Sequence, residues 1–372
     1  MNTKKVLIIG SKGMLGQELL RVFPADANYE VFGWDKLLVS DTNNIDITNE
    51  AQVRKKIGAL APEIIINAAA YNNVDKAEEP AEFELAKKLN GLAPGYLAKA
   101  AREIHNPPTP LCAKGAGEGD FLRKGGESGA IFVHYSTDYV FDGQKEEGYK
   151  ENDDPSPISN YGRTKLMGEQ EVAKVGGQYY IIRLQKLFGR SAQSAAAKKS
   201  FFETMLASAR VKKEIEVVDE ELANFTYAPD LAEYTKFLVD GNFFNPPTPL
   251  CVRGAGKRES YPSGIYHITN EGAPATWFGA AKILFETANN CHPEPRYGGA
   301  QDLARMGDPA SAGDSSLRSR SVQNDNVPKL IPVPASKFPR PAKRPKYSIL
   351  LNTKLPPLRP WPEALKEFLA NR

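Results

Sequence analysis

The sequence has few cysteines, no strong excess of one charge and no long hydrophobic run. Its 372 residues include three cysteines, whose spacing fits neither a metal site nor a disulfide scaffold. Lysine plus arginine (48) nearly balance aspartate plus glutamate (45), which excludes a strong field for nucleic acid or an anionic membrane. No apolar run approaches the roughly 18 residues of a membrane span, and the N-terminal one is too short for a signal peptide. We therefore expect a soluble, cytoplasmic protein without nucleic-acid or membrane partners.

Glycine and proline are concentrated in three stretches. Residues 106–117 recur at 245–256 with two differences, and residues 297–326 are rich in Gly, Ser, Asp and Arg without apolar periodicity. Removing about 105–129, 245–263 and 297–326 joins regular segments and leaves about 300 residues. We interpret these stretches as inserted surface loops that resemble translated palindromic repeat elements. A proline-rich docking peptide is the alternative.

The remaining sequence alternates short apolar runs with helical segments. Strands are predicted at residues 5–10, 30–34, 63–68, 130–135 and 179–184, and helices at 14–23, 51–61, 81–101 (broken near Pro94) and 161–175. This order predicts an α/β fold, a Rossmann-type doubly wound parallel sheet with a smaller C-terminal α/β lobe. The expected division is 1–185 for the first domain and 186–372 mainly for the lobe, with some segments returning to the first domain.

A glycine-rich turn follows the first predicted strand. Gly10, Gly13 and Gly16 lie between strand and helix, and Met14 and Leu15 precede the last of them. Glycines permit a tight turn and a close backbone approach, while the N–H groups of a helix N-terminus bind a pyrophosphate. The turn therefore predicts binding of a dinucleotide. A glycine-rich turn without a ligand is the alternative.

Further candidates for cofactor contact follow the next two strands. Asp35 ends the second strand, where a carboxylate binds the adenosine ribose hydroxyls and disfavours a 2′-phosphate, so NADH is favoured. A solvated strand end is the alternative. Small side chains at the end of the third strand would let adenine and ribose lie against the backbone. The candidates at this sheet edge are Asp46, Ile47, Ala68, Ala69 and Ala70.

The most specific pattern pairs Tyr161 with Lys165 on one face of a predicted helix. A nearby ammonium favours phenolate and lowers the tyrosine pKa, so that Tyr161 can exchange a proton near neutral pH. Lys165 can also bind a ribose hydroxyl. Thr137, at the end of the preceding strand, can donate to the carbonyl oxygen that Tyr161 protonates. With the glycine turn, these residues predict hydride-transfer chemistry.

The chain resembles the extended short-chain dehydrogenases/reductases and, among them, the dTDP-4-dehydrorhamnose reductase family. The resemblance covers nearly the whole chain outside the three inserts. The stretches that carry it are Pro62–Tyr71, Val74–Glu78, His134–Gly143, Tyr149 to Lys165, Thr226–Ala232, Gly264–His267 and Arg344–Ser348. Among them, the Ser-Thr-Asp-Tyr-Val-Phe-Asp-Gly motif at residues 136–143 is the most specific.

The resemblance implies reduction of a dTDP-4-keto-6-deoxyhexose to dTDP-L-rhamnose with NADPH or NADH. It assigns proton donation to Tyr161, binding of the nicotinamide ribose to Lys165 and a hydrogen bond with the substrate oxygen to Thr137. Asp138 and Tyr139 lie beside Thr137 and are expected to contact the sugar. Arg344 is a candidate for the substrate diphosphate, because a guanidinium binds phosphate in a bidentate manner; a solvated arginine is the alternative.

Two departures from the family pattern concern the sugar pocket. The family usually has Thr-Ser-Trp after the strand at 179–184, and that tryptophan contacts the sugar. Here Lys186 takes its place, so a cation replaces an aromatic surface. The stretch Glu221–Phe225 also departs from the family's Gln-x-Gly-x-Pro. We expect Lys186 to contact the substrate, and Trp277 to pack in a core.

Other functions remain open on the same scaffold. An epimerase or another nucleotide-sugar reductase shares the catalytic pair, and proteins similar to this family serve as regulatory subunits of methionine adenosyltransferase. Some relatives form dimers assisted by Mg²⁺. We see no carboxylate cluster for a metal, so none is assigned, while a homodimer is compatible with the resemblance.

Overall fold

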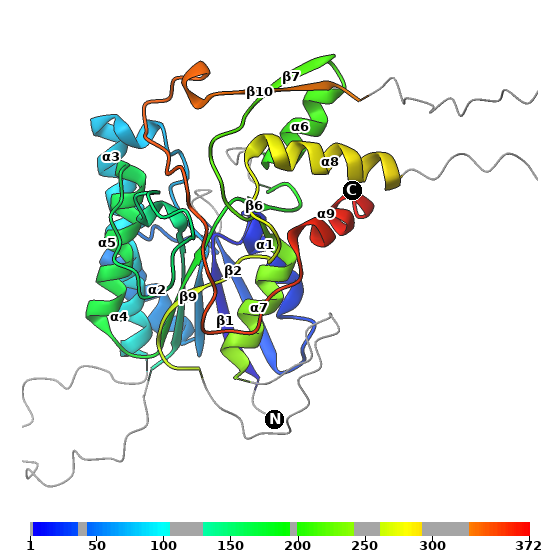
Figure 1. Ribbon diagram of the computed structural model, residues 1–372. Coiled ribbons are helices and arrows are strands. Elements are labelled where there is room, and N and C mark those ends of the chain that lie inside the picture. Colours follow the sequence, from blue (N-terminus) through cyan, green and yellow to red (C-terminus); the bar gives the residue numbers. More distant parts are fainter. Residues whose placement is uncertain (1–2, 36–42, 105–128, 194–198, 242–260, 292–326) are drawn as a thin grey trace, which may run out of the picture.

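A six-stranded parallel sheet forms the centre of the protein (Figure 1). The computed structural model describes residues 3–35, 43–104, 129–193, 199–241, 261–291 and 327–372. The strand order is β2-β1-β3-β4-β5-β9. These strands are β1 (Lys4–Ile9), β2 (Tyr29–Trp34), β3 (Ile64–Asn67), β4 (Ile131–Thr137), β5 (Tyr179–Leu184) and β9 (Gly264–His267). The predicted α/β fold with a doubly wound parallel sheet is confirmed.

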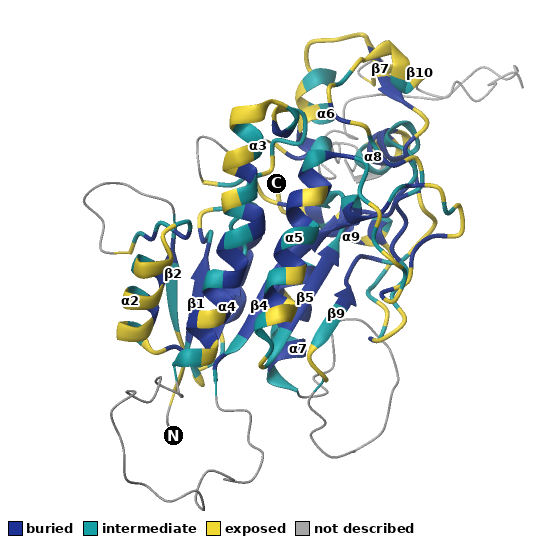
Figure 2. Cartoon of the chain, turned by 90° about the vertical axis from the view of Figure 1, so that its left-hand side faces the viewer, coloured by how far each residue is buried: buried dark blue, intermediate teal, exposed yellow. Residues whose placement is uncertain are grey.

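Helices cover both faces of this sheet, which explains why its strands are apolar throughout. The helices are α1 (Met14–Val22) and α7 (Ala228–Asp240) on one face, and α2 (Glu50–Leu60), α4 (Ala93–Glu103) and α5 (Asn160–Val175) on the other. Val6 and Ile8 of β1 pack on the first face, and Leu7 and Ile9 pack on the second. Burial on both sides gives a run of apolar residues rather than alternation. Figure 2 shows α4 and α5 lying in front of the central strands, which are largely buried.

The helical region predicted at 81–101 is interrupted, but not at the expected place. It consists of α3 (Pro80–Ala86), a π-helical segment η2 (Lys87–Leu92) and α4. Pro94 lies in the first turn of α4, where no N–H is needed for the helix. The irregular segment instead precedes it, and there Asn90 exchanges two hydrogen bonds with the backbone of Tyr71 and donates to Thr164 of α5. The break thus ties α5 to the loop after β3.

A smaller set of elements packs around its own core beside the sheet. It contains α6 (Phe201–Ala209), α8 (Trp277–Cys291), α9 (Trp361–Ala370) and four short strands, β6 (Leu187–Phe188), β7 (Glu214–Val218), β8 (Thr226–Tyr227) and β10 (Lys329–Val333). Phe202, Phe225 and Trp361 are buried at the centre of this core. β7 pairs with β10, and β6 pairs with β8.

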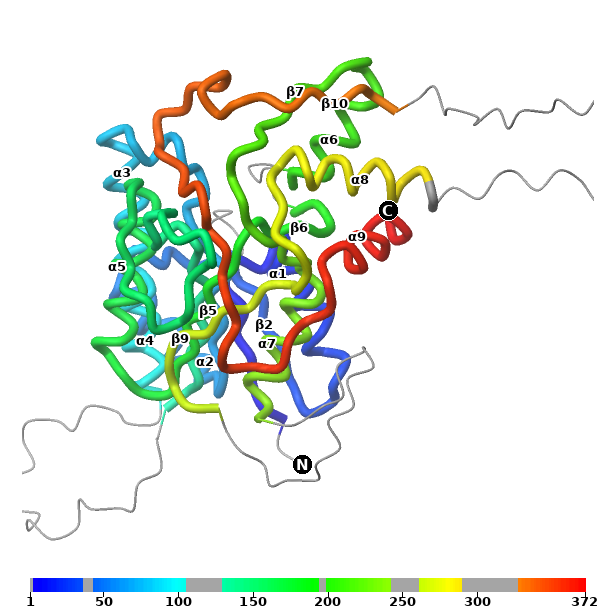
Figure 3. The backbone as a smooth tube through the Cα atoms, in the orientation of Figure 1, coloured from blue at the N-terminus to red at the C-terminus, as the bar shows by residue number. Residues whose placement is uncertain are grey.

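Several segments after residue 186 lie on the central sheet rather than in this smaller lobe. β9 forms an edge strand beside β5, and α7 packs on α1. Figure 3 shows the segment after β10 running down past β5 and β9 before it turns up to α9. Along this path Leu350 pairs with Tyr149, and the Leu351 carbonyl lies 3.1 Å from Nδ1 of His267. The boundary between residues 185 and 186 remains a prediction.

The three predicted inserts lie almost entirely outside the described residues, so their interpretation stays a prediction. The structure does not describe residues 105–128, 242–260 and 292–326. Within the described residues, no helix has the length and apolar character needed to cross a membrane. The cytoplasmic location and the homodimer remain predictions.

Candidate active site

The predicted site residues converge at the carboxyl edge of the parallel strands. Gly10 follows β1, Ala68 follows β3, and Thr137 ends β4. Thr137 pairs in register with Leu184, the last residue of β5. Open α/β sheets bind ligands at this edge. The topology therefore brings together residues that are far apart in the sequence.

The glycine turn leaves no room for side chains. Gly10 has φ +81°, and a Cβ there would lie 2.6 Å from the Ala69 nitrogen. A Cβ on Gly16 would lie 2.1 Å from the Gly10 carbonyl oxygen. Gly13 is the N-cap of α1 and has no side chain to cap the helix. The N–H groups of the first turn, at Met14 and Leu15, are thus not capped by a side chain and can bind an anion.

Asp35 is held against the glycine turn. Its Oδ2 accepts a hydrogen bond of 2.7 Å from the backbone N–H of Lys12. This contact places a carboxylate at the end of β2, where the sequence predicts ribose binding. Ala68, Ala69 and Ala70 are half-buried at the adjoining edge.

Asp46 and Ile47 lie at the same edge but are engaged locally. Oδ1 of Asp46 accepts from the backbone N–H and the hydroxyl of Thr48, at 2.9 and 2.6 Å. The side chain of Ile47 packs in the core with 5% exposed. These contacts explain how the start of α2 is shaped, and the assignment of both residues to the cofactor stays a prediction.

A segment after β6 closes over the glycine turn, which the sequence does not indicate. The Gln193 N–H donates to the Lys12 carbonyl at 3.0 Å, and the Gln17 amide donates to the Ser191 carbonyl at 3.1 Å. Gly189 also lies close to Met14, because a Cβ built on this glycine would be 3.7 Å from Cγ of Met14. A tight glycine turn, an uncapped helix start and a carboxylate at the end of β2 together fit a dinucleotide.

Helix α5 carries Tyr161 and Lys165 and lies unusually close to its neighbours. A Cβ on Gly162 would lie 2.2 Å from the Tyr139 carbonyl oxygen, and one on Gly168 would lie 2.1 Å from that of Asn90. The Ser159 hydroxyl caps the helix by accepting from the Gly162 N–H. Gly162 lets α5 approach the turn after β4, and Gly168 lets it approach η2. Tyr161 and Lys165 are consequently 9% and 2% exposed.

The predicted lowering of the Tyr161 pKa is wrong. Burial, and then the charge of Asp138, raise the pKa of Tyr161 above its ordinary value. Nζ of Lys165 donates to the Tyr135 carbonyl at 2.6 Å. Burial lowers the pKa of Lys165 to about 8, and the charge of Glu169 opposes this shift. The Tyr161 hydroxyl therefore stays protonated at neutral pH.

Thr137, Asp138 and Tyr139 form the turn beside Tyr161. Oγ1 of Thr137 donates to Oδ1 of Asp138 at 2.9 Å. The ring of Tyr139 packs edge-on against that of Tyr161, with centroids 5.6 Å apart. Asp138 is 3% exposed, and burial raises its pKa to about 6. The turn thus bonds a buried acid to the Thr137 hydroxyl and packs the Tyr139 ring against Tyr161.

Lys186 follows β5, and its ammonium lies between aromatic rings. Its Nζ lies 4.1 Å from the ring centroid of Trp277 and 5.1 Å from that of Phe225. It donates to the Glu221 carbonyl at 2.9 Å. Its backbone has φ +38°, an uncommon and strained value for a residue other than glycine. Burial lowers the pKa of Lys186 to about 8, while the charges of Glu221 and Asp138 oppose this shift.

Trp277 was expected to pack in a core, and it does so only in part. It is half-buried, contacts Phe201, Phe225 and Lys186, and donates from Nε1 to Oε2 of Glu221 at 2.8 Å. The other carboxylate oxygen of Glu221 pairs with Arg340. The stretch that departs from the family pattern therefore supplies the link between Trp277 and the C-terminal segment.

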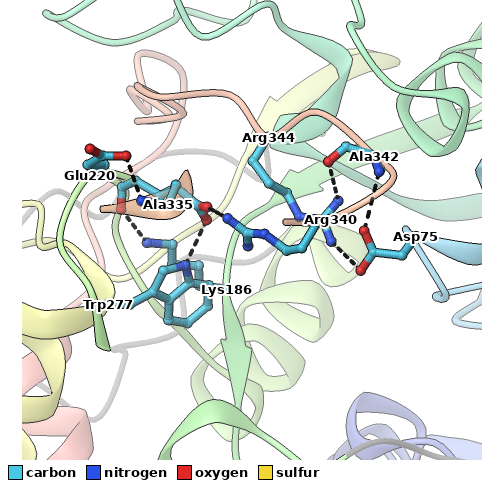
Figure 4. Close-up of polar contacts among 9 residues, drawn as sticks. Asp75, Lys186, Glu220, Trp277, Ala335, Arg340, Ala342 and Arg344 are labelled. Carbon is cyan, nitrogen blue, oxygen red and sulfur yellow. Dashed lines mark hydrogen bonds and ion pairs between the residues drawn. The ribbon is translucent and has the colours of Figure 1, made fainter. Parts of the chain in front are cut away.

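Arg344 lies over the site but is held by an ion pair (Figure 4). Its guanidinium donates to Oδ2 of Asp75 at 2.8 Å and lies 5.8 Å from the ring centroid of Tyr139. An open cavity of about 870 Å³ lies beside it. One wall is formed by Asp219–Leu222 and the other by the segment 335–347, which includes Arg340 and Arg344. Asp75 and Arg344 are 269 positions apart, so no local pattern could have paired them.

Metal ligation finds no support in the part of the chain that the structure describes. No group of three or more His, Cys, Asp or Glu side chains is arranged there to hold a metal ion.

Comparison with known proteins agrees with this geometry. The dTDP-4-dehydrorhamnose reductase of Burkholderia thailandensis is 31% identical over 98% of this chain and 92% of its own length, and that of Escherichia coli is 28% identical over 94% and 89%. The crystal structure of dTDP-4-dehydrorhamnose reductase from Bacillus anthracis in complex with NADP has a TM-score of 0.70 at 27% identity, with both chains covered in full. A Clostridium acetobutylicum relative also gives 0.70, at 29% identity and 99% coverage of both chains. The family model described as RmlD substrate binding domain matches residues 4–107 and 116–372, so the chain belongs to this family, as its sequence motifs predict.

Proposed function

We propose that the chain reduces the 4-keto group of dTDP-4-dehydro-L-rhamnose to give dTDP-L-rhamnose. It is an NAD(P)-dependent oxidoreductase of the extended short-chain dehydrogenase/reductase type. The observation that carries the proposal is the placement of Thr137, Tyr161 and Lys165 at the sheet edge that also holds the glycine turn. The activity for which the relatives are named supports the choice of substrate.

The glycine turn, Asp35 and Ala68–Ala70 would hold the cofactor, NADPH or NADH. When bound, the reduced nicotinamide supplies the hydride that the 4-keto carbon accepts. The N–H groups at the start of α1 bind the pyrophosphate. The carboxylate of Asp35 suits ribose hydroxyls and favours NADH, whereas the Bacillus anthracis relative was solved with NADP. Both cofactors therefore belong in the assay.

Tyr161 donates its proton to the 4-keto oxygen. Its buried, neutral hydroxyl is available for this role, since burial raises its pKa. Lys165 binds the nicotinamide ribose, and its ammonium stabilises the phenolate that remains after proton transfer. Its pKa of about 8 keeps it mostly charged at neutral pH.

The nucleotide part of the substrate occupies the cavity between Asp219–Leu222 and the segment 335–347. Arg344 binds the diphosphate through its guanidinium, which pairs with the carboxylate of Asp75 in the structure. The diphosphate would take the place of that carboxylate. Asp138, Tyr139 and Lys186 would contact the sugar. Lys186 and Trp277 together replace the aromatic surface that the family usually places at this point.

The test is an assay of the reduction of dTDP-4-keto-6-deoxyhexose, in which the loss of NADH or NADPH fluorescence is measured over time. We expect one cofactor oxidised for each dTDP-L-rhamnose formed. Tyr161→Phe should lower kcat by at least about 100-fold, since general acid catalysis contributes about that much, while the Kd for NADH stays within about twofold. An epimerase would convert the sugar without net consumption of cofactor, and a regulatory subunit would do neither. Either result would refute the proposed reduction.

A further inference from the structure

Besides Arg344, the segment 335–347 brings an exposed aromatic ring and a second guanidinium group to the cavity. Phe338 is 42% exposed and lines the cavity together with Arg340 and Arg344 (Figure 4). A single exposed apolar side chain needs no explanation. A ring beside two guanidinium groups is different, because nucleobases stack on aromatic rings and guanidinium groups bind phosphate. The three side chains therefore offer the contacts that a nucleotide needs.

The backbone that carries these side chains is stiff. Proline is the next residue after Phe338, after Arg340 and after Arg344. A proline has a fixed φ, and the residue before it is restricted to extended conformations. A ligand that binds to these side chains consequently has little backbone to order, which lowers the entropic cost of binding.

Carboxylates on the opposite wall hold the segment in place and leave donors for a ligand. Glu220 accepts from the Ala335 N–H at 2.8 Å, and Glu221 pairs with Arg340. The bond to Glu221 uses Nη2 of Arg340. A guanidinium group has five N–H donors, so Arg340 can keep this ion pair and still donate to a phosphate from its other nitrogens.

The exposure of the three side chains gives their order. The Arg344 guanidinium lies 5.8 Å from the ring centroid of Tyr139, and that ring packs on Tyr161. The side chains of Arg344 and Arg340 are 11% and 27% exposed, and Phe338 is 42% exposed. Arg344 thus lies deepest and Phe338 nearest the solvent. A nucleotide sugar has the same linear order, from the sugar through two phosphates to the base.

We propose that Arg340 is a second phosphate-binding residue and that Phe338 stacks on the nucleobase. With the sugar at Tyr161, Arg344 binds the phosphate attached to the sugar, and Arg340 binds the phosphate attached to the nucleoside. Residues 338–344 then form a clamp for the nucleoside diphosphate. The proposal rests on the proposed function, because its ligand is the nucleotide part of that substrate.

Calorimetric titrations with dTDP, dTMP and inorganic pyrophosphate separate these roles without turnover. Arg340→Met should raise the Kd for both dTDP and dTMP about 10- to 100-fold, since both carry the phosphate attached to the nucleoside. Arg344→Met should raise the Kd for dTDP by a similar factor and that for dTMP by less than about threefold, because dTMP lacks the outer phosphate. Phe338→Ala should raise the Kd for both nucleotides about tenfold and leave pyrophosphate binding unchanged.

Matched variants serve as controls. Phe338→Tyr keeps the ring and should bind dTDP like the wild type, whereas Phe338→Leu, which keeps apolar bulk only, should not. Arg340→Lys keeps the charge without the planar fork and should recover only part of the affinity. Lys337→Met removes a neighbouring cation that pairs with Glu216 and should leave all three Kd values unchanged. Phe338 is exposed, so its variants should fold even if the loss of Arg340 destabilises the protein.

The proposal is overturned if the wild type does not bind dTDP, if Arg340→Met changes the Kd for dTDP or dTMP no more than Lys337→Met does, or if Phe338→Ala and Phe338→Tyr act alike. If the wild type and its variants bind as expected but the wild type reduces no 4-keto sugar, the proposed function fails and the clamp stands. If the wild type reduces the sugar while the Arg340 and Phe338 variants bind dTDP normally, the clamp fails and the proposed function stands.

Discussion

Replacing Glu169 with glutamine should lower the free energy of unfolding by about 3–5 kcal/mol, the usual cost of leaving one member of a buried ion pair alone. Glu169 lies one turn after Lys165 on α5. Its two carboxylate oxygens accept from Arg183 at 3.0 and 2.6 Å, and Ser136 also donates to it. Glu169 and Arg183 are 3% and 1% exposed. Glutamine would place N–H donors against those of Arg183 and leave the guanidinium charge without compensation.

Urea unfolding of the single variants and of a double variant tests this reasoning. Arg183→Met should cost about as much as Glu169→Gln, since it leaves the carboxylate alone. Glu169→Leu combined with Arg183→Met should cost much less than the sum of the two, because no charge remains buried. Glu50→Gln is the control. It breaks a pair with Lys99 of which both side chains are 51% exposed, and it should change stability by less than about 1 kcal/mol.

The same variant connects stability to the site. The charge of Glu169 raises the pKa of Lys165, which burial lowers to about 8. Without that charge the pKa of Lys165 falls further, so the ammonium is lost at lower pH. The alkaline limb of kcat/KM for NADH should therefore move to lower pH in Glu169→Gln. The reasoning is refuted if Glu169→Gln costs no more than Glu50→Gln, or if its alkaline limb does not move.

Two other substitutions test the cofactor and substrate sites. Gly10→Ala should weaken NADH binding at least about tenfold, because its Cβ would lie 2.6 Å from a backbone nitrogen at a φ of +81°. Gly58→Ala, where a Cβ meets nothing within 4 Å, should leave the Kd for NADH unchanged in the same titration. Equal effects of the two variants would contradict the steric argument. Arg344→Ala should raise KM for the dTDP-sugar about 10- to 100-fold, because a charge-assisted hydrogen bond contributes about 1.5–3 kcal/mol. The Kd for NADH should not change. An unchanged KM in steady-state assays would mean that the diphosphate binds elsewhere.

The parts of the protein that the sequence predicts are those with local signals. Strands covered on both faces are continuous apolar runs, so β1, β3 and β5 could be located to within about two residues. The glycine turn could be recognised because its spacing reflects contacts within a few residues, such as that between Gly10 and Gly16. Tyr161 and Lys165 are separated by one helical turn, so their common face follows from the helix itself.

The parts that could not be predicted depend on contacts between distant segments. The closure of residues 189–193 over the turn, and the pairing of Asp75 with Arg344, have no pattern in the sequence around them. The sequence predicts a break near Pro94, and the irregular segment is formed by residues 87–92 just before it, where Asn90 bonds to Tyr71. The sequence predicts a fall in the tyrosine pKa, because it shows the neighbouring Lys165 and not the burial of Tyr161. Burial, which requires the fold, has the larger effect.

Position 186 shows what a comparison of motifs leaves out. The sequence indicates that an aromatic surface in the sugar pocket has been exchanged for a cation. In the structure, the aromatic surface is present as well, because Trp277 comes from the start of α8 to within 4.1 Å of the Lys186 ammonium. Glu221 holds both residues, the lysine through its carbonyl and the tryptophan through its carboxylate. The departures at 186 and 221 therefore belong to one connected set of contacts, which brings an aromatic ring and a buried ammonium together. A change of sugar specificity should then require substitutions at Lys186, Glu221 and Trp277 together, not at Lys186 alone.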